Sequence, residues 1–210
     1  CRLRSKNGVQ RPLKGGGSVS LCFVGDILLD RGVRQHVENT AKQRGYQDEA
    51  KAVHQLFDTS IDQLFHSSQV VVANLECPAT DIHSPVMKRF IFRGEPSWLP
   101  VLKHHGITHC NLANNHSVDQ GRKGLLSTIE NVRRAGMIPF GAGNNMDEAS
   151  CPVLLVRQPR PVYLLASLQM PLENFPFLPQ RPCVSQMNIE TLCQRIRQLK
   201  KKEPNCVVFV

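Results

Sequence analysis

The 210-residue sequence has no apolar run long enough to cross a membrane, which takes about 20 residues in a helix. Only 6% of its residues are aromatic, so few side chains are available to stack on nucleic-acid bases. No nucleic-acid-binding motif accompanies the basic residues, and no internal repeat is present. These absences argue against a membrane-spanning segment within the sequence and against a specific nucleic-acid partner.

None of the eight cysteines forms a C-x-x-C pair, which argues against a zinc knuckle. Cys22, Cys110 and Cys206 lie in apolar, strand-like runs, where a thiol commonly serves as a small core residue. We interpret most of the others as free thiols too. Cys1 differs, because a leading cysteine before a basic, glycine-rich segment fits a lipidated N-terminus; chance placement is the alternative.

The chain is basic, with a formal net charge of +9 and clusters of Lys and Arg at residues 2–14 and 200–202. A solvated basic surface is the simplest interpretation. The alternative is affinity for a polyanionic partner or for membrane headgroups. The 41% of hydrophobic residues suffice for the core of one domain or a little more.

Apolar patterning predicts an α/β domain over residues 18–210, after a flexible, glycine-rich tether in residues 1–17. Buried strands are predicted at 18–25, 69–75, 106–114, 137–143 and 206–210, a more peripheral strand at 88–94, and a hairpin from 152–158 and 161–168. Helical stripes are predicted over 50–67, 97–105, 121–136 and 189–199. The alternation of strand and helix predicts a central, mostly parallel sheet.

Polar residues follow three of the predicted strands. They are Asp26, Asp30 and Arg31 in GDILLDRG, Asn74 and Glu76 in NLECP, and Asn114, Asn115, His116 and Asp119 in NLANNHSVDQG. Neighbouring strands lie about 5 Å apart, so the three tips are expected to meet at one edge of the sheet. Converging carboxylates repel one another unless a positive charge lies between them. The pattern therefore predicts a divalent cation held by carboxylate, amide and imidazole groups.

Each of these residues also has a purely structural interpretation. Asp26 and Asp30 could cap helix N-termini, and Glu76 could be a solvated turn carboxylate. Asn115 could occupy a left-handed turn position. A lone histidine such as His116 is more often structural than catalytic. Finding such residues after three separate strands favours a shared site over these alternatives.

Arg93 adds a further candidate in the segment FRGEP, residues 92–96. Its guanidinium could clamp a carboxylate or phosphate through its fork of donors. The alternative is a surface ion pair between Arg93 and Glu95.

Five segments together resemble the CapA family of capsule-synthesis and poly-γ-glutamate-biosynthesis proteins. They are GDILLDRGV, ANLECPAT, FRGEPSWLPVLKHHGI, NLANNHSVDQGRKGLLSTIENVRRAGMIPFGAG and the EAS-P segment. The similarity runs from about Val19 to Val210, with the motifs in the family's order. The resemblance implies a four-layered α/β sandwich like that of the metallo-dependent phosphatases.

In that superfamily an Asp, a second acidic group and an Asn-His pair build a two-metal site. The resemblance implies that Asp26 and Glu76 are metal ligands and that Asn115 contacts the metal or the substrate. His116 would be the general acid, oriented by Asp119. The remaining candidates would contact the substrate: Asp30, Arg31, Asn74, Arg93 and Asn114. The ion would be divalent, with Mn, Mg, Zn, Fe and Ca as the candidates.

Two features depart from the superfamily pattern. Leu28 stands where such phosphatases usually carry a histidine, so one ion is as consistent with the sequence as two. The family's later motifs, a His-Trp-Gly segment and a Gly-His-x-x-His-like segment, do not occur within these residues. Their absence predicts an incomplete domain, truncated after its last strand, in which the full protein would work normally. If instead the chain is complete, we expect it to be inactive alone.

The family resemblance predicts an envelope protein on the extracytoplasmic face, acting in synthesis, export or anchoring of an anionic polymer such as poly-γ-glutamate. Other capsule-synthesis membrane proteins would be its partners, with the N-terminus at the membrane surface. One alternative is a metal-dependent hydrolase of a phosphoester or an envelope polymer. Another is a non-catalytic module that binds polyanions, and a cytoplasmic location is the alternative to the envelope.

Overall fold

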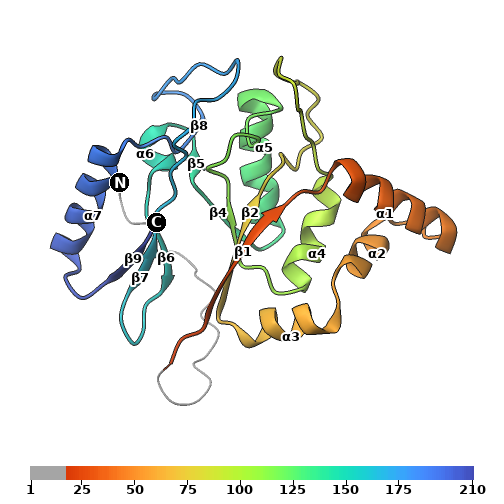
Figure 1. The fold of residues 1–210 in the computed structure, drawn as a ribbon, viewed down its shortest axis with the longest axis horizontal. Coiled ribbons are helices and arrows are strands. Elements are labelled where there is room, and N and C mark those ends of the chain that lie inside the picture. The colour runs from red at the N-terminus through yellow and green to blue at the C-terminus, as the bar shows by residue number, and fades with distance from the viewer. Residues whose placement is uncertain (1–17) are drawn as a thin grey trace.

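A parallel sheet of four strands lies at the centre of the fold. The computed structural model describes residues 18–210, so the predicted tether in residues 1–17 lies outside the described residues. The sheet runs in the order β1 (Leu21–Ile27), β2 (Val70–Leu75), β3 (His109–Asn111) and β4 (Ile138–Phe140), as Figure 1 shows. Helical segments connect successive strands, which is how parallel neighbours are joined. The predicted parallel sheet is confirmed.

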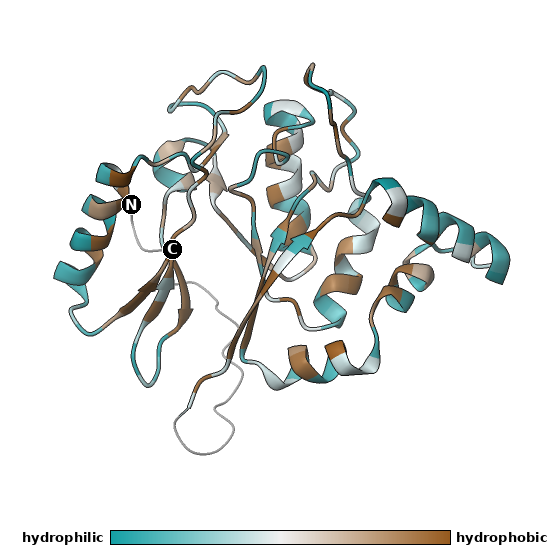
Figure 2. Cartoon of the chain, viewed as in Figure 1, coloured by the Kyte–Doolittle hydropathy of each residue, from teal (hydrophilic) through white to brown (hydrophobic). Residues whose placement is uncertain are grey.

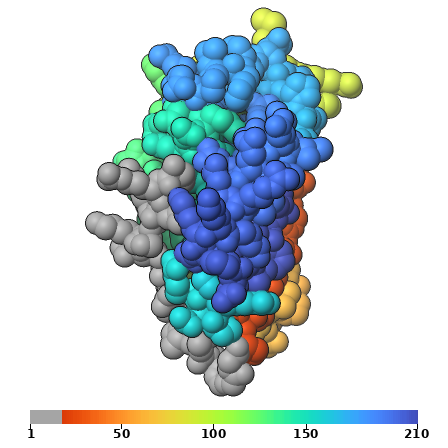
Figure 3. Space-filling view, turned by 90° about the vertical axis from the view of Figure 1, so that its left-hand side faces the viewer, coloured from red at the N-terminus to blue at the C-terminus, as the bar shows by residue number. Residues whose placement is uncertain are grey.

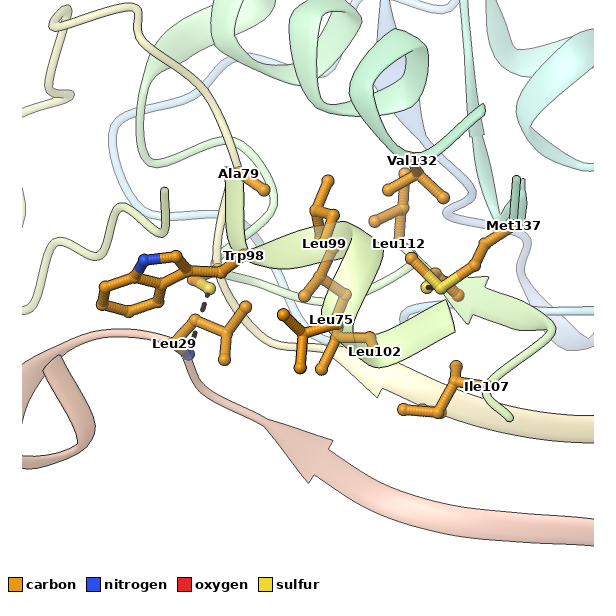
Figure 4. Close-up of a cluster of buried hydrophobic side chains, with 14 of the residues drawn as sticks. Leu29, Leu75, Ala79, Trp98, Leu99, Leu102, Ile107, Leu112, Val132 and Met137 are labelled. Carbon is orange, nitrogen blue, oxygen red and sulfur yellow. Dashed lines mark hydrogen bonds between the residues drawn. The ribbon is translucent and has the colours of Figure 1, made fainter. Parts of the chain in front are cut away.

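Helices cover one face of this sheet. They are α1 (Arg31–Arg44), α2 (Ala50–Val53), α3 (Thr59–Ser67), α4 (Leu99–His104) and α5 (Gly121–Arg134), with short 3₁₀ turns η1 (His54–Leu56) and η2 (Pro96–Trp98). Side chains alternate along a strand, and Val71, Ala73 and Leu75 of β2 point into this helical layer. Figure 4 shows the resulting core, in which Trp98 and Leu99 pack near Leu75.

A second, smaller sheet packs on the other face of the parallel sheet. It runs in the order β6 (Val153–Val156), β7 (Val162–Leu164) and β9 (Val207–Phe209). Val70 and Val72 of β2 meet Leu155 and Leu164 there in a separate apolar cluster. The predicted hairpin is the antiparallel pair β6–β7.

Helix α7 (Ile189–Lys202) forms the outermost layer, because Leu199 packs with Tyr163 on the far side of the second sheet. Figure 3 shows α7 on this surface of the molecule. A small sheet of β5 (Ala142–Gly143) and β8 (Cys183–Val184), with α6 (Met146–Ala149) beside it, links the two halves. The order helix, sheet, sheet, helix is consistent with the predicted four-layered sandwich.

The strand predicted at 88–94 is wrong. This segment is a loop that meets another part of the chain through an isolated bridge between Ala79 and Gly94. Two of its backbone N–H groups bond carboxylate side chains instead of a neighbouring strand. The Phe92 N–H donates to Asp119 at 2.7 Å, and the Arg93 N–H donates to Asp30 at 2.9 Å.

The helix predicted over 50–67 is interrupted. Phe57 is extended, and Asp58 caps α3 by accepting hydrogen bonds from the backbone N–H groups of Ser60 and Ile61. An aspartate in this position ends one helical segment and begins the next, because its carboxylate replaces the missing intrahelical acceptors. Apolar residues recur at helical spacing on both sides of Asp58, so the sequence pattern did not predict this break.

Helix α1 was not predicted, because its buried residues are only Val37 and Ala41. Figure 2 shows that most of its surface is hydrophilic. The strands β1 and β9, predicted to be buried, are edge strands of their sheets. Phe23 of β1 and Phe209 of β9 are partly exposed and pack against each other, with ring centroids 5.4 Å apart.

Candidate functional site

The carboxyl ends of β1, β2 and β3 bring polar side chains into one row. Asp26 lies opposite Asn74 in the register of β1 and β2, and Asn74 lies opposite Asn111 in the register of β2 and β3. All three strands run in the same direction, so the residues that follow them share one edge of the sheet. The predicted convergence of these tips is therefore present in the structure.

The side-chain amide of Asn74 joins two carboxylates. Its Nδ2 donates to Asp26 Oδ1 at 2.7 Å and to Glu76 Oε2 at 2.5 Å. Its Oδ1 accepts from Asn111 Nδ2 at 3.1 Å and from Asn114 Nδ2 at 3.0 Å. These contacts use both donors and both lone pairs of the amide. Asn74 therefore holds the two acids together.

The carboxylate of Glu76 is electrostatically unfavourable in this position. Burial raises its pKa above the usual range, and the nearby charge of Asp26 raises it further. The His116 side chain and the hydrogen bond from Asn74 act in the opposite direction without cancelling the increase. A positive charge placed beside Asp26 and Glu76 would relieve this repulsion.

The loop after β3 is shaped by Asn114. Its Oδ1 accepts hydrogen bonds from the backbone N–H groups of His116 and Ser117, at 3.1 and 2.9 Å. Its Nδ2 donates to Leu75 O at 2.9 Å as well as to Asn74. The side chain is buried and serves this turn, so its contacts are internal.

Asn115 is positioned mainly through its backbone. Its carbonyl oxygen accepts a hydrogen bond from Lys88 Nζ at 2.9 Å. Its side chain forms no hydrogen bond with any other residue in the 18–210 range. The amide that was predicted to contact a metal or substrate thus has no internal partner there.

His116, Asp119 and Lys88 form a connected group. His116 Nδ1 lies 2.9 Å from Asp119 Oδ2, and Lys88 Nζ lies 2.5 Å from Asp119 Oδ1. The Asp119 side chain is 0% exposed and that of Lys88 is 4% exposed, so this is a buried ion pair. The imidazole of His116 also stacks on Phe92, with centroids 4.1 Å apart. Asp119 and Phe92 together orient the His116 ring. An orienting role had been predicted for Asp119 but not for Phe92.

Lys88, Phe92 and Asn111 were not singled out from the sequence. Asn111 lay within a polar stretch at a strand end, which was a usable signal. No signal in the segment MKRFIFRG distinguished Lys88 from its neighbours Arg89 and Arg93.

Arg31 flanks this group. Its guanidinium lies over the rings of Phe90 and Phe92, 5.6 and 5.3 Å from the centroids. The Phe92 ring thus contacts both the guanidinium of Arg31 and the imidazole of His116. Arg31 is exposed and lies at the start of α1, where an anion could reach it.

Asp30 and Arg93 are engaged in an internal ion network. Asp30 bonds the side chain of Arg34 at 3.1 Å and the backbone N–H of Arg93 at 2.9 Å. Glu95 lies 2.7 Å from Arg34 and 2.5 Å from Arg93, and Arg93 also donates to Thr80 O. The pairing of Arg93 with Glu95 matches the structural alternative for Arg93. Their predicted contact with substrate stays a prediction.

The donor set fits one weakly chelated, hard cation better than a closed metal centre. Within residues 18–210, no three His, Cys, Asp or Glu side chains gather closely enough to hold a metal ion between them. The carboxylates of Asp26 and Glu76 do meet, through Asn74. Mg²⁺ and Ca²⁺ accept such a partial set and complete it with water, whereas structural zinc takes four protein ligands.

The fold and the site define the class of protein: an α/β sandwich with acidic, amide and imidazole groups at the carboxyl edge of its parallel sheet. The family described as bacterial capsule synthesis protein PGA_cap matches residues 20–210. The chain belongs to this family, and the resemblance drawn from its motifs is confirmed.

Three curated relatives are similar over part of the chain. The PGA biosynthesis protein CapA of Bacillus subtilis is 29% identical over 133 residues, covering 62% of this chain and 32% of the relative. The capsule biosynthesis protein CapA of Bacillus anthracis is 25% identical over 134 residues, covering 62% and 30%. A probable polyglutamine synthesis accessory protein of Mycobacterium tuberculosis is 27% identical over 150 residues, covering 61% and 40%. The aligned region thus spans between 30% and 40% of the length of these relatives.

No helix from Ser18 onward combines the length and the apolarity that crossing a lipid bilayer requires.

Proposed function

We propose that this protein is an accessory factor in the synthesis, export or anchoring of an anionic capsule polymer of the poly-γ-glutamate type. The support comes from the family and from relatives named for capsule and PGA biosynthesis. The working site would be the carboxyl edge of the parallel sheet, with a divalent cation held by Asp26 and Glu76. Such a cation would neutralise the two acids and attract the carboxylates of the polymer.

The observation that carries this proposal is the shared amide of Asn74. It holds Asp26 and Glu76 together although burial, and then the charge of Asp26, disfavour the Glu76 carboxylate and raise its pKa. Carboxylates with perturbed pKa values gather preferentially at functional sites. Asp26 is exposed, so an ion or an acidic chain can approach from solvent.

The second candidate function is hydrolysis of a phosphoester or of an envelope polymer. The observation in its favour is His116, whose Nδ1 is held by Asp119 while its Nε2 has no hydrogen-bond partner in the described part of the chain. The imidazolium form of a ring oriented in this way can deliver its Nε2 proton to a leaving group while Nδ1–H stays on Asp119. A bound cation would activate the attacking water and polarise the bond to be broken.

Calorimetric titration of Mg²⁺, Ca²⁺ and Mn²⁺ into the chelator-treated chain tests the cation proposal. We expect one site, weakened at least about tenfold by Asp26→Asn and by Glu76→Gln, since each removes one charged ligand. Glu130→Gln, on the exposed surface of α5, is the matched control and should bind like the unmodified protein. Equal affinities in all four proteins would refute the metal site.

Polymer binding is a separate measurement. Poly-γ-glutamate should bind more tightly with the cation present, and its affinity should fall as salt is raised, because the contacts are ionic. Binding that ignores both cation and salt would contradict the proposed role of this edge. Polymer binding that weakens as salt is raised but does not depend on the divalent cation would favour the alternative of a non-catalytic, polyanion-binding module.

Turnover separates the hydrolase from the accessory factor. The chain is incubated with cation and either 4-nitrophenyl phosphate or poly-γ-glutamate, and the products are quantified. A hydrolase requires turnover that His116→Ala reduces by about 10²-fold or more, which is the usual contribution of a general acid. If that variant retains full turnover, the acid role of His116 is wrong.

The cell envelope is the proposed location, on the extracytoplasmic face and beside the membrane proteins that make the capsule. The names of the relatives and the net charge of +9, which suits anionic headgroups and polymers, support it. Anchoring through a lipid on Cys1 is part of this proposal, and Cys1 lies outside the described residues. Fractionation of cells carrying Cys1→Ser would test it, since a lipid-anchored protein should leave the membrane fraction.

A further inference from the structure

Two histidines that the proposed function does not use lie in contact on the helical face of the sheet. His54 is the first residue of η1, and His105 directly follows α4. His54 Nδ1 lies 2.9 Å from His105 Nε2. The other ring nitrogen of His105, Nδ1, bonds the carboxylate of Asp62 in α3. A chain of three titratable groups therefore connects η1, α4 and α3.

The His105 ring is held firmly in place. The residue is 6% exposed, and its imidazole stacks on Phe57 with centroids 4.1 Å apart and an interplanar angle of 5°. His66, in the next turn of α3, bonds the carbonyl oxygen of Asp62, so it does not compete for the carboxylate. The His105 ring cannot turn away from its partner without giving up Asp62 or Phe57. We therefore expect any separation of the two rings to move His54 and η1.

Counting protons limits the charge states in which the contact between the rings can exist. An imidazole nitrogen either carries a proton and donates, or lacks one and accepts. The contact between His54 Nδ1 and His105 Nε2 therefore needs one proton between the two nitrogens, while His105 Nδ1 keeps its own proton for the Asp62 carboxylate. When both rings are neutral, His54 Nδ1–H donates to His105 Nε2, and His54 Nε2 is unprotonated.

A first added proton leaves this contact intact. It binds the unprotonated His54 Nε2, and the proton between the rings can then belong to either nitrogen. Every other ring nitrogen of the pair is now protonated, so a second added proton must enter between the rings. Two N–H groups would then face each other across 2.9 Å, on two cationic rings with centroids 5.0 Å apart. Like charges repel and neither N–H has an acceptor, so the rings must separate.

The surrounding groups oppose full protonation of the pair. Burial lowers the pKa of His54 from its ordinary value of 6.5, and the charges of His105 and His104 lower it further. The carboxylates of Asp62 and Asp48 act in the opposite direction without cancelling the decrease. His104 meets both rings edge-on, with centroids 5.0 and 5.2 Å away. The second proton therefore enters in the mildly acidic range, below about pH 6.5.

We propose that the contact between His54 and His105 is a pH-sensitive switch. Its closed form holds η1 against α4 while no more than one added proton is present, and its open form appears when both rings are fully protonated. Helix α2 runs directly into η1 and packs on α1, so opening loosens this part of the helical layer. Because α1 begins at Arg31, beside the candidate site, the switch links that helix to the acidity of the medium. The switch does not depend on the function proposed above.

Nitrogen NMR of the imidazoles tests the proton count in the unmodified chain. At about pH 8, both Nδ1 atoms of the pair should carry a proton and both Nε2 atoms should not. Between about pH 8 and about pH 4.5, the pair should take up two protons in steps at least about one pH unit apart, because the charged rings are coupled. The proposal is overturned if the rings titrate together in one step, if His105 Nε2 is protonated at the start, or if the second proton does not enter in this range.

Amide hydrogen exchange locates the opening. After correction for the intrinsic effect of pH on exchange, protection of residues 50–56 should fall about tenfold or more between about pH 8 and the end of the second step. Protection of α5, which lies in the same layer and takes no part in the contact, should stay the same. An equal change in both segments would indicate a general loss of stability and would refute the switch.

Two variants separate this pair from the other histidines. His54→Gln cannot take up a proton, yet its amide can donate to neutral His105 or accept from protonated His105, so residues 50–56 should stay protected at both pH values. His36→Gln, at an exposed position of α1, is the matched control and should open like the unmodified protein. A pH-dependent loss of protection that persists in His54→Gln, or disappears in His36→Gln, would contradict the assignment to this pair.

Discussion

From the buried ion pair between Lys88 and Asp119 we predict how substitution of Lys88 changes the free energy of unfolding. Asp119 has no exposed surface and Lys88 almost none, so each charge depends on the other. Lys88→Met keeps the length of the side chain and removes its charge. It leaves the Asp119 carboxylate buried with only the His116 ring and the Phe92 N–H as partners.

Breaking a buried ion pair from one side costs about 3–5 kcal/mol. Because two of the partners of Asp119 remain, we expect the lower end, about 3 kcal/mol of unfolding free energy. Replacing both residues, in Lys88→Met with Asp119→Asn, removes the unpaired charge. The double variant should therefore be more stable than Lys88→Met alone.

Urea titration at pH 7 measures these differences. Trp98 is the single tryptophan and is 1% exposed, so its fluorescence reports exposure of the core directly. Lys123→Met, at an exposed position of α5, is the matched control and should change stability by less than about 0.5 kcal/mol. A loss below about 1 kcal/mol in Lys88→Met, or a double variant less stable than the single one, would refute the reasoning.

Three further predictions concern single residues. The pKa of His109 is lowered from 6.5 to about 4, so its contribution to stability is complete above pH 6.5 and falls by about 3 kcal/mol as the pH drops to 4. Urea titrations across this range should show that component in the unmodified protein and lack it in His109→Leu. Gly141 has φ +78° and an added Cβ would lie 2.8 Å from Asn111 Oδ1, so Gly141→Ala should lower the unfolding free energy by about 1–3 kcal/mol. Gly32→Ala has open space and should not; equal losses would contradict the steric argument. The raised pKa of Glu76 means that its ionisation weakens the folded state as pH rises above about 4, so Glu76→Gln should raise the melting temperature at pH 7 in chelator. That gain should vanish at pH 3, and a gain that persists there would exclude the charge as its cause.

Local pattern was sufficient to predict several elements. The stripe of Leu125, Ile129 and Val132 defines α5, and all three are buried as predicted. The run at residues 69–75 defines β2. Pattern failed where apolar residues were misleading or few. The apolar stripe over 50–67 continues across the helix cap at Asp58, so it predicted one helix where there is a break. Helix α1 buries only two apolar residues, which is too weak a pattern to predict a helix.

Part of the candidate site could also be predicted from the sequence. Residues that follow parallel strands must share an edge, so the approach of Asp26 and Glu76 could be inferred from order along the chain alone. The partners of each residue could not. Only the structure shows, for example, that Glu95 and Thr80 accept hydrogen bonds from Arg93, whose predicted contact with substrate stays a prediction.

The sequence by itself determined the four strands of the central sheet and the polar groups that follow them, because strand and helix periodicities are local properties of the chain. Only the tertiary structure decided that Asn74 would bridge two acids, that Lys88 would enter the interior to meet Asp119, and that His54 would contact His105. Those outcomes depend on distances between residues far apart in sequence. Such distances are set by how the four layers pack, which no local pattern encodes.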